Sequence, residues 1–355
     1  MDYVPLSFAQ RRLWFLDQLE PGNPQYNTPV GAAISGPLNV ALLEQTINEI
    51  VKRHEALRTI LPVVNGQPVQ RILPSLDIKL PVIDLTHLPA SERRQQAIKI
   101  RDDEASVAFD LATGPLARVV LLRLDEEEHW LLLLTHHVVF DSWSVGIFSQ
   151  ELALVYSALM EGVQPSLPDL EIQYADFAVW QRQSLQGKVL EEQLDFWMQK
   201  LKTAPPVLQM STDRPRPAVQ TFRGRIESIR FSVELTHALR EMSREGVTLY
   251  MIFLAAFKTL LFRYSSQADI IVSGGVAHRN RSELENLIGC FINILLFRTD
   301  LSGDPTFLDL LRRVQKVTLD VYAHQDVPFE KIVAALHPTR DLSFNPLTQV
   351  MLVLH

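Results

Sequence analysis

Residues 131–146 read Leu-Leu-Leu-Leu-Thr-His-His-Val-Val-Phe-Asp-Ser-Trp-Ser-Val-Gly. This stretch is the most informative part of the chain. The run of leucines predicts a buried strand. Directly after it come two imidazoles, a carboxylate and two hydroxyls. Histidine has the unperturbed pKa closest to neutral pH, and a rigid strand end provides the positional precision that a catalytic base needs. This stretch is therefore the first candidate for a functional site.

Composition narrows the class of protein. The chain has 355 residues, which suits two domains, and 47% hydrophobic content predicts a large core. A net charge of −7 gives no general attraction to phosphate backbones or anionic lipid, so neither nucleic acid nor membrane is expected as a partner. The single cysteine, Cys290, cannot form an internal disulfide, which suits the cytoplasm. We interpret it as a small buried hydrophobic residue.

Apolar periodicity and turn residues predict alternating helices and strands in both halves of the chain. This pattern is typical of an α/β fold with mixed sheets and packed helices. Helices are predicted from Ser7, where Ser7 and Gln10 have capping-box spacing, at 40–53, after the histidines, near 191–201, at 235–245, at 249–262 and around 307–321. Strands are predicted at 31–34, 69–73, 117–124, 130–135, 225–231, 269–273, 289–299 and 349–354.

Four interpretations of residues 136–146 are open. A metal site would need both histidines, yet adjacent strand residues point to opposite faces. A serine hydrolase is suggested by Ser-Trp-Ser-Val-Gly at 142–146, although the elbow's first glycine is missing and the histidine precedes the serine. A structural interpretation makes the histidines core residues and Asp141 a helix cap. In a histidine-dependent acyltransferase, His137 would orient a nucleophile while Asp141 pairs with a cation that braces the loop.

The fourth interpretation agrees with a resemblance that covers nearly the whole chain. Residues 136–144 closely resemble the His-His-x-x-x-Asp-Gly signature of condensation domains of nonribosomal peptide synthetases. Six further segments resemble motifs of that family in the same order, which is far more specific than one match. They are 7–16, 53–59, 174–180, 288–293, 324–330 and 340–347.

The resemblance implies a pseudo-dimer of two chloramphenicol-acetyltransferase-like subdomains arranged in a V with a central tunnel. Residues 1–172 would form the N-terminal subdomain with the histidine motif, 173–222 the crossover and 223–355 the C-terminal subdomain. Domains of this family continue past the last motif, so we expect the C-terminal subdomain to be truncated at its end.

The resemblance also implies the reaction and the partners. A donor acyl or peptidyl thioester would be joined to the amine of an acceptor aminoacyl thioester. Both substrates would be tethered to the phosphopantetheine of donor and acceptor peptidyl carrier protein domains, with an adenylation domain adjacent. No intrinsically bound cofactor and no metal is implied.

Residue roles follow from the same motifs. His137 takes the role of the second motif histidine and accepts a hydrogen bond or a proton from the attacking amine. His136 packs and braces the loop. Asp141 is structural, and its expected salt-bridge partner is Arg279. The residues assigned to the substrate or the tunnel are Ser142, Trp143, Ser144 and Asn293.

Two other functions stay open. One is a non-catalytic or truncated condensation-like domain that docks a carrier protein or a tailoring enzyme. The other is an epimerisation or ester-forming relative. Intact His137 and Asp141 favour catalysis, whereas Ser142 and the expected truncation favour docking.

Ser142 departs from the family, which has glycine at this position. If the position requires a positive φ or close backbone approach to the pantetheine arm, serine adds strain or bulk. Ser142→Gly is then expected to raise turnover in an amide-forming assay, and a lower turnover would contradict the strain argument.

Overall fold

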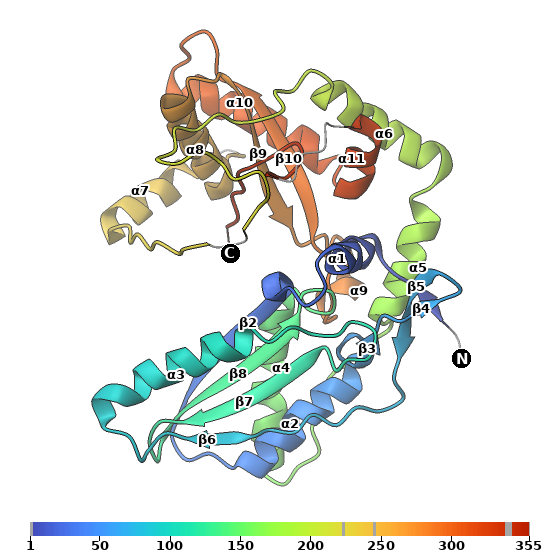
Figure 1. Cartoon of the computed structure of the whole chain (residues 1–355), viewed down its shortest axis with the longest axis vertical. Coiled ribbons are helices and arrows are strands. Elements are labelled where there is room, and N and C mark those ends of the chain that lie inside the picture. The colour runs from blue at the N-terminus through green and yellow to red at the C-terminus, as the bar shows by residue number, and fades with distance from the viewer. Residues whose placement is uncertain (1–2, 222–223, 244–245, 338–342, 355) are drawn as a thin grey trace. The chain divides into compact units, whose positions relative to one another are not determined.

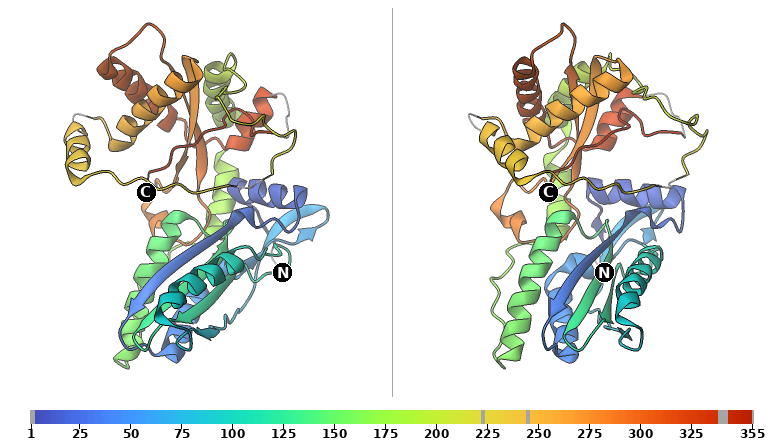
Figure 2. Two further views of the ribbon diagram at one scale, coloured as in Figure 1. Left: turned by 60° about the vertical axis from the view of Figure 1, so that its left-hand side comes forward. Right: turned by 90° about the vertical axis from the view of Figure 1, so that its left-hand side faces the viewer.

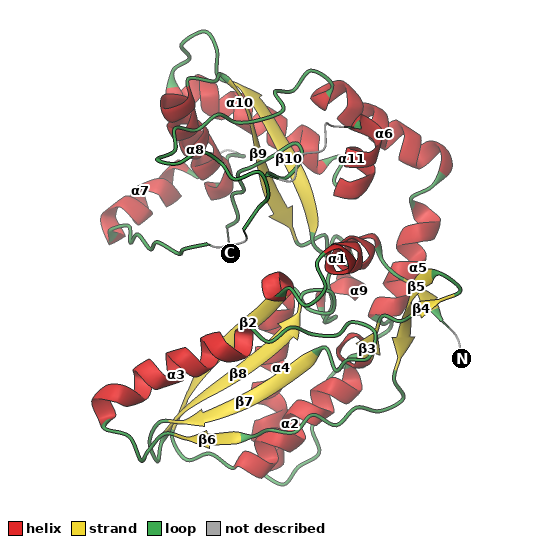
Figure 3. Cartoon of the chain, viewed as in Figure 1, coloured by secondary structure: helices red, strands yellow, loops and turns green. Residues whose placement is uncertain are grey.

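The computed structural model describes residues 3–221, 224–243, 246–337 and 343–354. The chain divides into two compact units (Figure 1). Unit 1 consists of Met1–Ser184 and Arg279–Phe291, and unit 2 consists of Leu185–His278 and Ile292–His355. The mixed α/β prediction is confirmed, since both units combine helices and strands (Figure 3). Arg279–Phe291, which the sequence boundaries assign to the C-terminal subdomain, belongs to unit 1.

Unit 1 is built around a sheet with the strand order β2 (Asn27–Ser35), β8 (Glu128–His136), β7 (Ala117–Arg123) and β6 (Val82–Asp84). The central strands β7 and β8, which correspond to the strands predicted at 117–124 and 130–135, pair antiparallel, and β6 pairs with β7 in parallel. Both faces of the sheet are covered (Figures 1 and 2). Helix α3 (Ala90–Ala105) lies on one face, and α2 (Val40–Arg53) and α4 (Ser142–Met160) lie on the other. This double coverage explains why the leucine run of β8 is apolar at every position rather than at alternate ones.

The described elements of unit 1 begin and end as follows. The strands are β1 (Val4–Pro5), β2 (Asn27–Ser35), β3 (Thr59–Ile60), β4 (Val63–Val64), β5 (Gln67–Ile72), β6 (Val82–Asp84), β7 (Ala117–Arg123) and β8 (Glu128–His136). The α-helices are α1 (Phe8–Leu19), α2 (Val40–Arg53), α3 (Ala90–Ala105), α4 (Ser142–Met160), α5 (Tyr174–Ser184) and α9 (Ser282–Glu285).

Local signals account for two of these helices. The predicted capping box at the start of α1 is confirmed, because Ser7 and Gln10 each satisfy the other's backbone N–H. Helix α2 has the predicted bounds, and its side chains Leu43, Ile47 and Ile50 are buried in the core.

Unit 2 is centred on an antiparallel pair of strands. Helix α8 packs against β9, and α10 packs against both β10 and α8. The elements are α6 (Gly187–Leu201), α7 (Val233–Met242), α8 (Leu249–Ser265), β9 (Asp269–Val276), β10 (Asn293–Asp300), α10 (Phe307–Tyr322) and α11 (Phe329–Leu336).

Helix α8 is the helix predicted at 249–262, and Lys258 within it is fully buried. The Lys258 ammonium donates hydrogen bonds to the carbonyl oxygens of Ile270 and Phe297 and to Thr299 Oγ1. Burial lowers the pKa of Lys258 well below its usual value. Within the described ranges, no helix combines the length and the hydropathy needed to cross a bilayer.

Three predicted strands need correction. Residues 225–231 form no strand, and Ile226 is 91% exposed there. The strand predicted at 289–299 begins only at Asn293, because the backbone N–H groups of Gly289 and Phe291 are bonded to Ser144 and Asp141 instead of to a strand. The strand predicted at 349–354 is reduced to one parallel bridge between Met351 and Ser273. Each segment has a strand-like sequence, but a strand also needs a neighbouring backbone with which to pair.

Some predictions fall outside the described residues. These are residues 340–342 of the last motif, Phe222 at the end of the crossover, and residues 244–245 at the end of the helix predicted at 235–245.

Candidate active site

The histidine motif occupies the connection between β8 and α4. Strand β8 ends at His136, and Asp141 is the N-cap of α4, where its Oδ1 accepts a hydrogen bond from the backbone N–H of Ser144 at 2.9 Å. The residues between the histidines and the cap, Val138, Val139 and Phe140, have no exposed surface. The loop is therefore fixed at both ends and packed in the middle.

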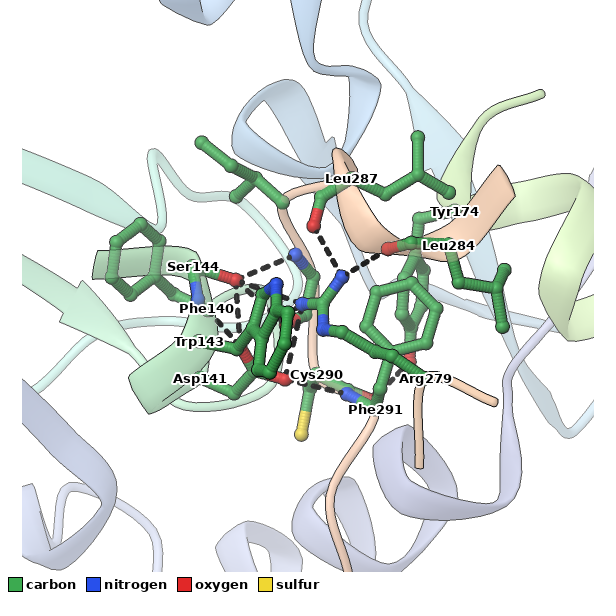
Figure 4. A network of polar contacts seen from close by, with 12 residues as sticks. Phe140, Asp141, Trp143, Ser144, Tyr174, Arg279, Leu284, Leu287, Cys290 and Phe291 are labelled. Atoms are coloured by element: carbon green, nitrogen blue, oxygen red, sulfur yellow. Dashed lines mark hydrogen bonds and ion pairs between the residues drawn. The ribbon is translucent and has the colours of Figure 1, made fainter. Parts of the chain in front are cut away.

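Asp141 is also one half of a buried ion pair (Figure 4). Arg279 Nη2 lies 3.1 Å from Asp141 Oδ1 and 3.3 Å from Oδ2, and the side chains are 1% and 0% exposed. The other terminal nitrogen of Arg279 donates to the carbonyl oxygens of Leu284 and Leu287, each at 2.6 Å. Burial lowers the pKa of Arg279, and the Asp141 carboxylate opposes that shift. This is the ion pair expected from the sequence.

The segment Gly289–Phe291 runs alongside the cap of α4. The backbone N–H of Phe291 donates to Asp141 Oδ2 at 3.1 Å, although these residues are 150 positions apart. Ser144 Oγ donates to Asp141 Oδ1 at 2.7 Å and lies 3.1 Å from both the N and the O of Gly289. The carboxylate and the hydroxyl together anchor a distant strip of backbone beside the histidine loop.

Gly289 is required here by close approach of an aromatic ring. A Cβ at this position would lie 2.1 Å from Cδ2 of Tyr174. Tyr174 is itself held by its hydroxyl, which donates to the carbonyl oxygen of Cys290 at 2.6 Å and lies 2.7 Å from Ser7 Oγ. The sequence motif containing Tyr174 has no residue pattern that reveals this role, because the ring meets Gly289 only in the folded chain.

His137 is the more accessible of the two histidines. Its Nδ1 lies 2.8 Å from the carbonyl oxygen of Phe140. A carbonyl oxygen can only accept, so Nδ1 carries the proton and Nε2 of the neutral ring carries the lone pair. Across the described parts of the chain, no residue forms a hydrogen bond with Nε2. Nε2 is therefore available as a hydrogen-bond acceptor.

His136 is buried instead, with 3% of its surface exposed. Its Nδ1 accepts a hydrogen bond from the backbone N–H of Val138 at 3.1 Å, and its ring meets the edges of Tyr26 and Phe109. Burial, with a smaller contribution from His137, lowers the pKa of His136 to about 4. Its imidazole is thus neutral at physiological pH and braces the loop.

The remaining residues assigned to the substrate or tunnel have varied environments. Ser142 is the exposed first residue of α4 and does not have a positive φ, so the backbone-strain part of the argument for Ser142→Gly is wrong. The part that concerns the bulk of serine beside a pantetheine arm stays a prediction. Trp143 is 47% exposed, and its indole N–H donates to the carbonyl oxygen of Glu285 at 2.9 Å. Ser144 has no exposed surface and uses its hydroxyl within the Asp141 network, because it lies one helical turn from the cap.

Asn293 lies in unit 2 and organises a loop there. Its amide nitrogen donates to the carbonyl oxygens of Gln325 and Val327 at 2.7 and 2.8 Å. Its amide oxygen accepts from the backbone N–H groups of Ile294 and Phe329. With these four bonds and 8% exposure, Asn293 holds the connection between α10 and α11.

A second buried charge cluster was not assigned from the sequence. Glu151 of α4 accepts from Arg53 Nε and lies beside His54 Nε2, both at 2.9 Å. His54 Nδ1 in turn lies 3.4 Å from the backbone N of Ile288. The Arg-His pair stands out in the segment 53–59, but Glu151 is an ordinary helix residue in sequence and joins the pair only through packing.

Loss of one partner of the buried ion pair should strongly destabilise the fold. Asp141→Asn removes the charge and turns an amide nitrogen toward the donors of Arg279, Ser144 or Phe291. Breaking one side of a buried ion pair costs about 3–5 kcal/mol, so denaturant unfolding should show a loss of this size. Asp102→Asn, which removes a surface carboxylate paired with Arg101, is the matched control and should cost less than about 1 kcal/mol. Equal losses in the two variants would contradict this account.

His136 should make stability depend on pH. The unfolded chain binds a proton at this residue near pH 6.5, whereas the folded chain binds one only near pH 4. Lowering the pH from 7 to 5 therefore favours unfolding by about 2 kcal/mol at this residue. His136→Asn, which keeps an acceptor for Val138, should lose that part of the dependence in urea titrations at both pH values. The exposed His87→Asn variant should retain it, and identical slopes for all three proteins would refute the assignment.

Comparison with known proteins agrees with this architecture. The family model described as Condensation domain matches residues 1–355. A linear gramicidin synthase of Brevibacillus parabrevis is 50% identical over 353 residues, covering 99% of this chain and 7% of that protein. The chain thus spans a small part of this curated relative.

Solved structures show the same fold. The X-domain in its complex with OxyB from teicoplanin biosynthesis is similar with a TM-score of 0.86 and 30% identity, covering 99% of this chain and 77% of that one. The first condensation domain of the calcium-dependent antibiotic synthetase has a TM-score of 0.85 at 20% identity, covering 100% of this chain and 88% of that one. The chain therefore belongs to the condensation-domain family.

Proposed function

We propose that this chain joins a donor acyl or peptidyl thioester to the amine of an acceptor aminoacyl thioester, with His137 acting on the amine. The observation that carries the proposal is the 2.8 Å contact between His137 Nδ1 and the Phe140 carbonyl oxygen. It leaves Nε2 as the lone-pair nitrogen on a half-buried, immobilised ring. A base held in this way is suited to orienting a nucleophile.

The chemistry needs no group beyond the two substrates and this imidazole. The amine nitrogen attacks the thioester carbonyl carbon, and a carbon–nitrogen bond forms. The carbon–sulfur bond then breaks, and the proton lost by the amine ends on the departing thiolate. His137 Nε2 accepts the amine's hydrogen bond or its proton during the attack, and the energy comes from the thioester.

Asp141 and Arg279 support this step indirectly. Neither side chain is exposed, so we assign them no contact with substrate. Their role is to keep the loop that carries His137 in one conformation. Ser142 and Trp143, which are exposed at the start of α4, remain candidates for contact with a substrate.

The partners are proposed from the length of the relatives. The linear gramicidin synthase is far longer than the region that it shares with this chain. This length supports a role for the chain as one domain among several. We propose donor and acceptor carrier protein domains as the sources of both thioesters and an adenylation domain as a neighbour. The phosphopantetheine arms then belong to the substrates, and this chain needs no resident cofactor.

A docking function is the second candidate. One structural neighbour at 30% identity is an X-domain in complex with OxyB. A domain of this fold can therefore be found bound to another protein. The Nε2 of His137, which has no hydrogen-bond partner among the described residues, favours catalysis over docking alone.

Intact-protein mass spectrometry of the two carrier proteins tests the proposal. A donor-loaded and an acceptor-loaded carrier are mixed with the chain, and the acceptor should gain the mass of the donor group. His137→Ala should slow this transfer about 10²–10⁴-fold, because general-base and orienting contributions are of this size.

His87→Ala, at an exposed position, is the matched control and should transfer at the wild-type rate. Transfer that survives unchanged in a folded His137→Ala protein would refute the role of this histidine. Donor loss without acceptor gain would indicate hydrolysis. A wild-type chain that binds a carrier without any transfer would overturn catalysis in favour of docking.

A further inference from the structure

We propose that Cys290 is a positioning residue through which the Asp141–Arg279 ion pair acts on the imidazole of His137. The inference rests on the proposed function, since it concerns the same histidine. It assigns a role to a side chain that the sequence suggests is only a small hydrophobic residue. Three features support it: how its backbone is held, where its sulfur lies, and what that contact does to the ring.

The backbone on both sides of Cys290 is held by buried groups. On one side, the N–H of Phe291 donates to Asp141 Oδ2 at 3.1 Å. On the other side, the N of Gly289 lies 3.1 Å from Ser144 Oγ. The carbonyl oxygen of Cys290 itself accepts from the Tyr174 hydroxyl at 2.6 Å. The position of this residue is therefore set by the same network that contains the ion pair, as Figure 4 shows.

The sulfur reaches the histidine. Cys290 Sγ lies 3.9 Å from His137 Nδ1, and the residue is 1% exposed. The same Nδ1 lies 2.8 Å from the Phe140 carbonyl oxygen. The protonated edge of the ring thus faces two groups, a carbonyl that accepts its hydrogen bond and a polarizable sulfur that packs beside it and is a weak acceptor.

Both of these groups depend on Asp141. Phe140 precedes Asp141 in the chain, so its carbonyl is oriented by the residue that caps α4. Cys290 precedes Phe291, whose N–H is bound to the same carboxylate. The buried Asp141 therefore influences the orientation of the His137 ring in two ways, through the Phe140 carbonyl and through Cys290. If the imidazole rotated by half a turn about its bond to Cβ, a ring carbon would face the Phe140 carbonyl oxygen and the hydrogen bond would be lost. The sulfur of Cys290 restricts the space available for that rotation.

Removal of the sulfur should free the ring. In Cys290→Ala the imidazole gains room beside Nδ1, so the Nδ1–H form should no longer be the only one populated. Nitrogen NMR of the ¹⁵N-labelled full chain without substrate reads the two tautomers of His137 directly. We expect one tautomer in the wild type and a mixture in Cys290→Ala. Because misplacement of a catalytic group is costly, kcat should fall about tenfold with KM unchanged.

Two further variants separate positioning from general destabilisation. Cys290→Val keeps an apolar branch beside the ring and should restore the single tautomer and most of kcat. Ser144→Ala leaves the Cys290 side chain intact but releases Gly289, so it should give the same tautomer mixture if the network positions the sulfur.

Val119→Ala, a truncation in the buried core of β7, is the matched control. It should lower stability and leave the tautomer and KM unchanged.

A single tautomer and an unchanged kcat in folded Cys290→Ala would overturn the inference. A tautomer mixture in Cys290→Ala without one in Ser144→Ala would overturn the link to the network. Failure of the proposed function gives a different result. In that case His137→Ala retains transfer or the wild type shows no transfer at all, while the tautomer measurement still reports on Cys290.

Discussion

The buried ion pair between Asp141 and Arg279 is the interaction on which the geometry of the candidate site depends. Removing two charges from water costs several kcal/mol per ion, and mutual attraction offsets this cost only when the remaining donors and acceptors are satisfied. Here the carboxylate receives hydrogen bonds from Ser144, Phe291 and Arg279, and the guanidinium also donates to two backbone carbonyls. Such a pair is better understood as a determinant of one conformation than as a large net source of stability.

Three structural features follow from this pair. The start of α4 is defined because the carboxylate caps it. The loop after β8 is held because Phe140 leads directly into the cap. The backbone of Gly289–Phe291 lies beside that loop because Ser144 and Asp141 bind it. The Asp141 carboxylate therefore binds parts of unit 1 that are far apart in sequence. We infer that His137, which lies between these parts, is held in one orientation as a result.

The two adjacent histidines show how burial alone separates chemical roles. His136 is enclosed by aromatic rings, and its lowered pKa keeps it neutral. His137, one residue later, leaves the sheet and retains a nitrogen without a hydrogen-bond partner among the described residues. The end of β8 produces this difference, because its last side chain still faces the core while the next residue begins the loop.

The sequence by itself determined the elements whose signals are local. The bounds of α2, the capping box of α1 and the β7–β8 hairpin all depend on residues within a few positions of one another. The motif order also pointed to Asp141 and Arg279. Tertiary structure alone decided the outcome for extended segments, whose hydrogen-bond partners are distant. Residues 225–231 have a strand-like pattern but no paired strand, and Gly289–Phe291 leave the predicted strand to bind Asp141 and Ser144. The contact of Cys290 with His137 belongs to the same class, because no local pattern encodes which side chain will fill the space beside a given ring.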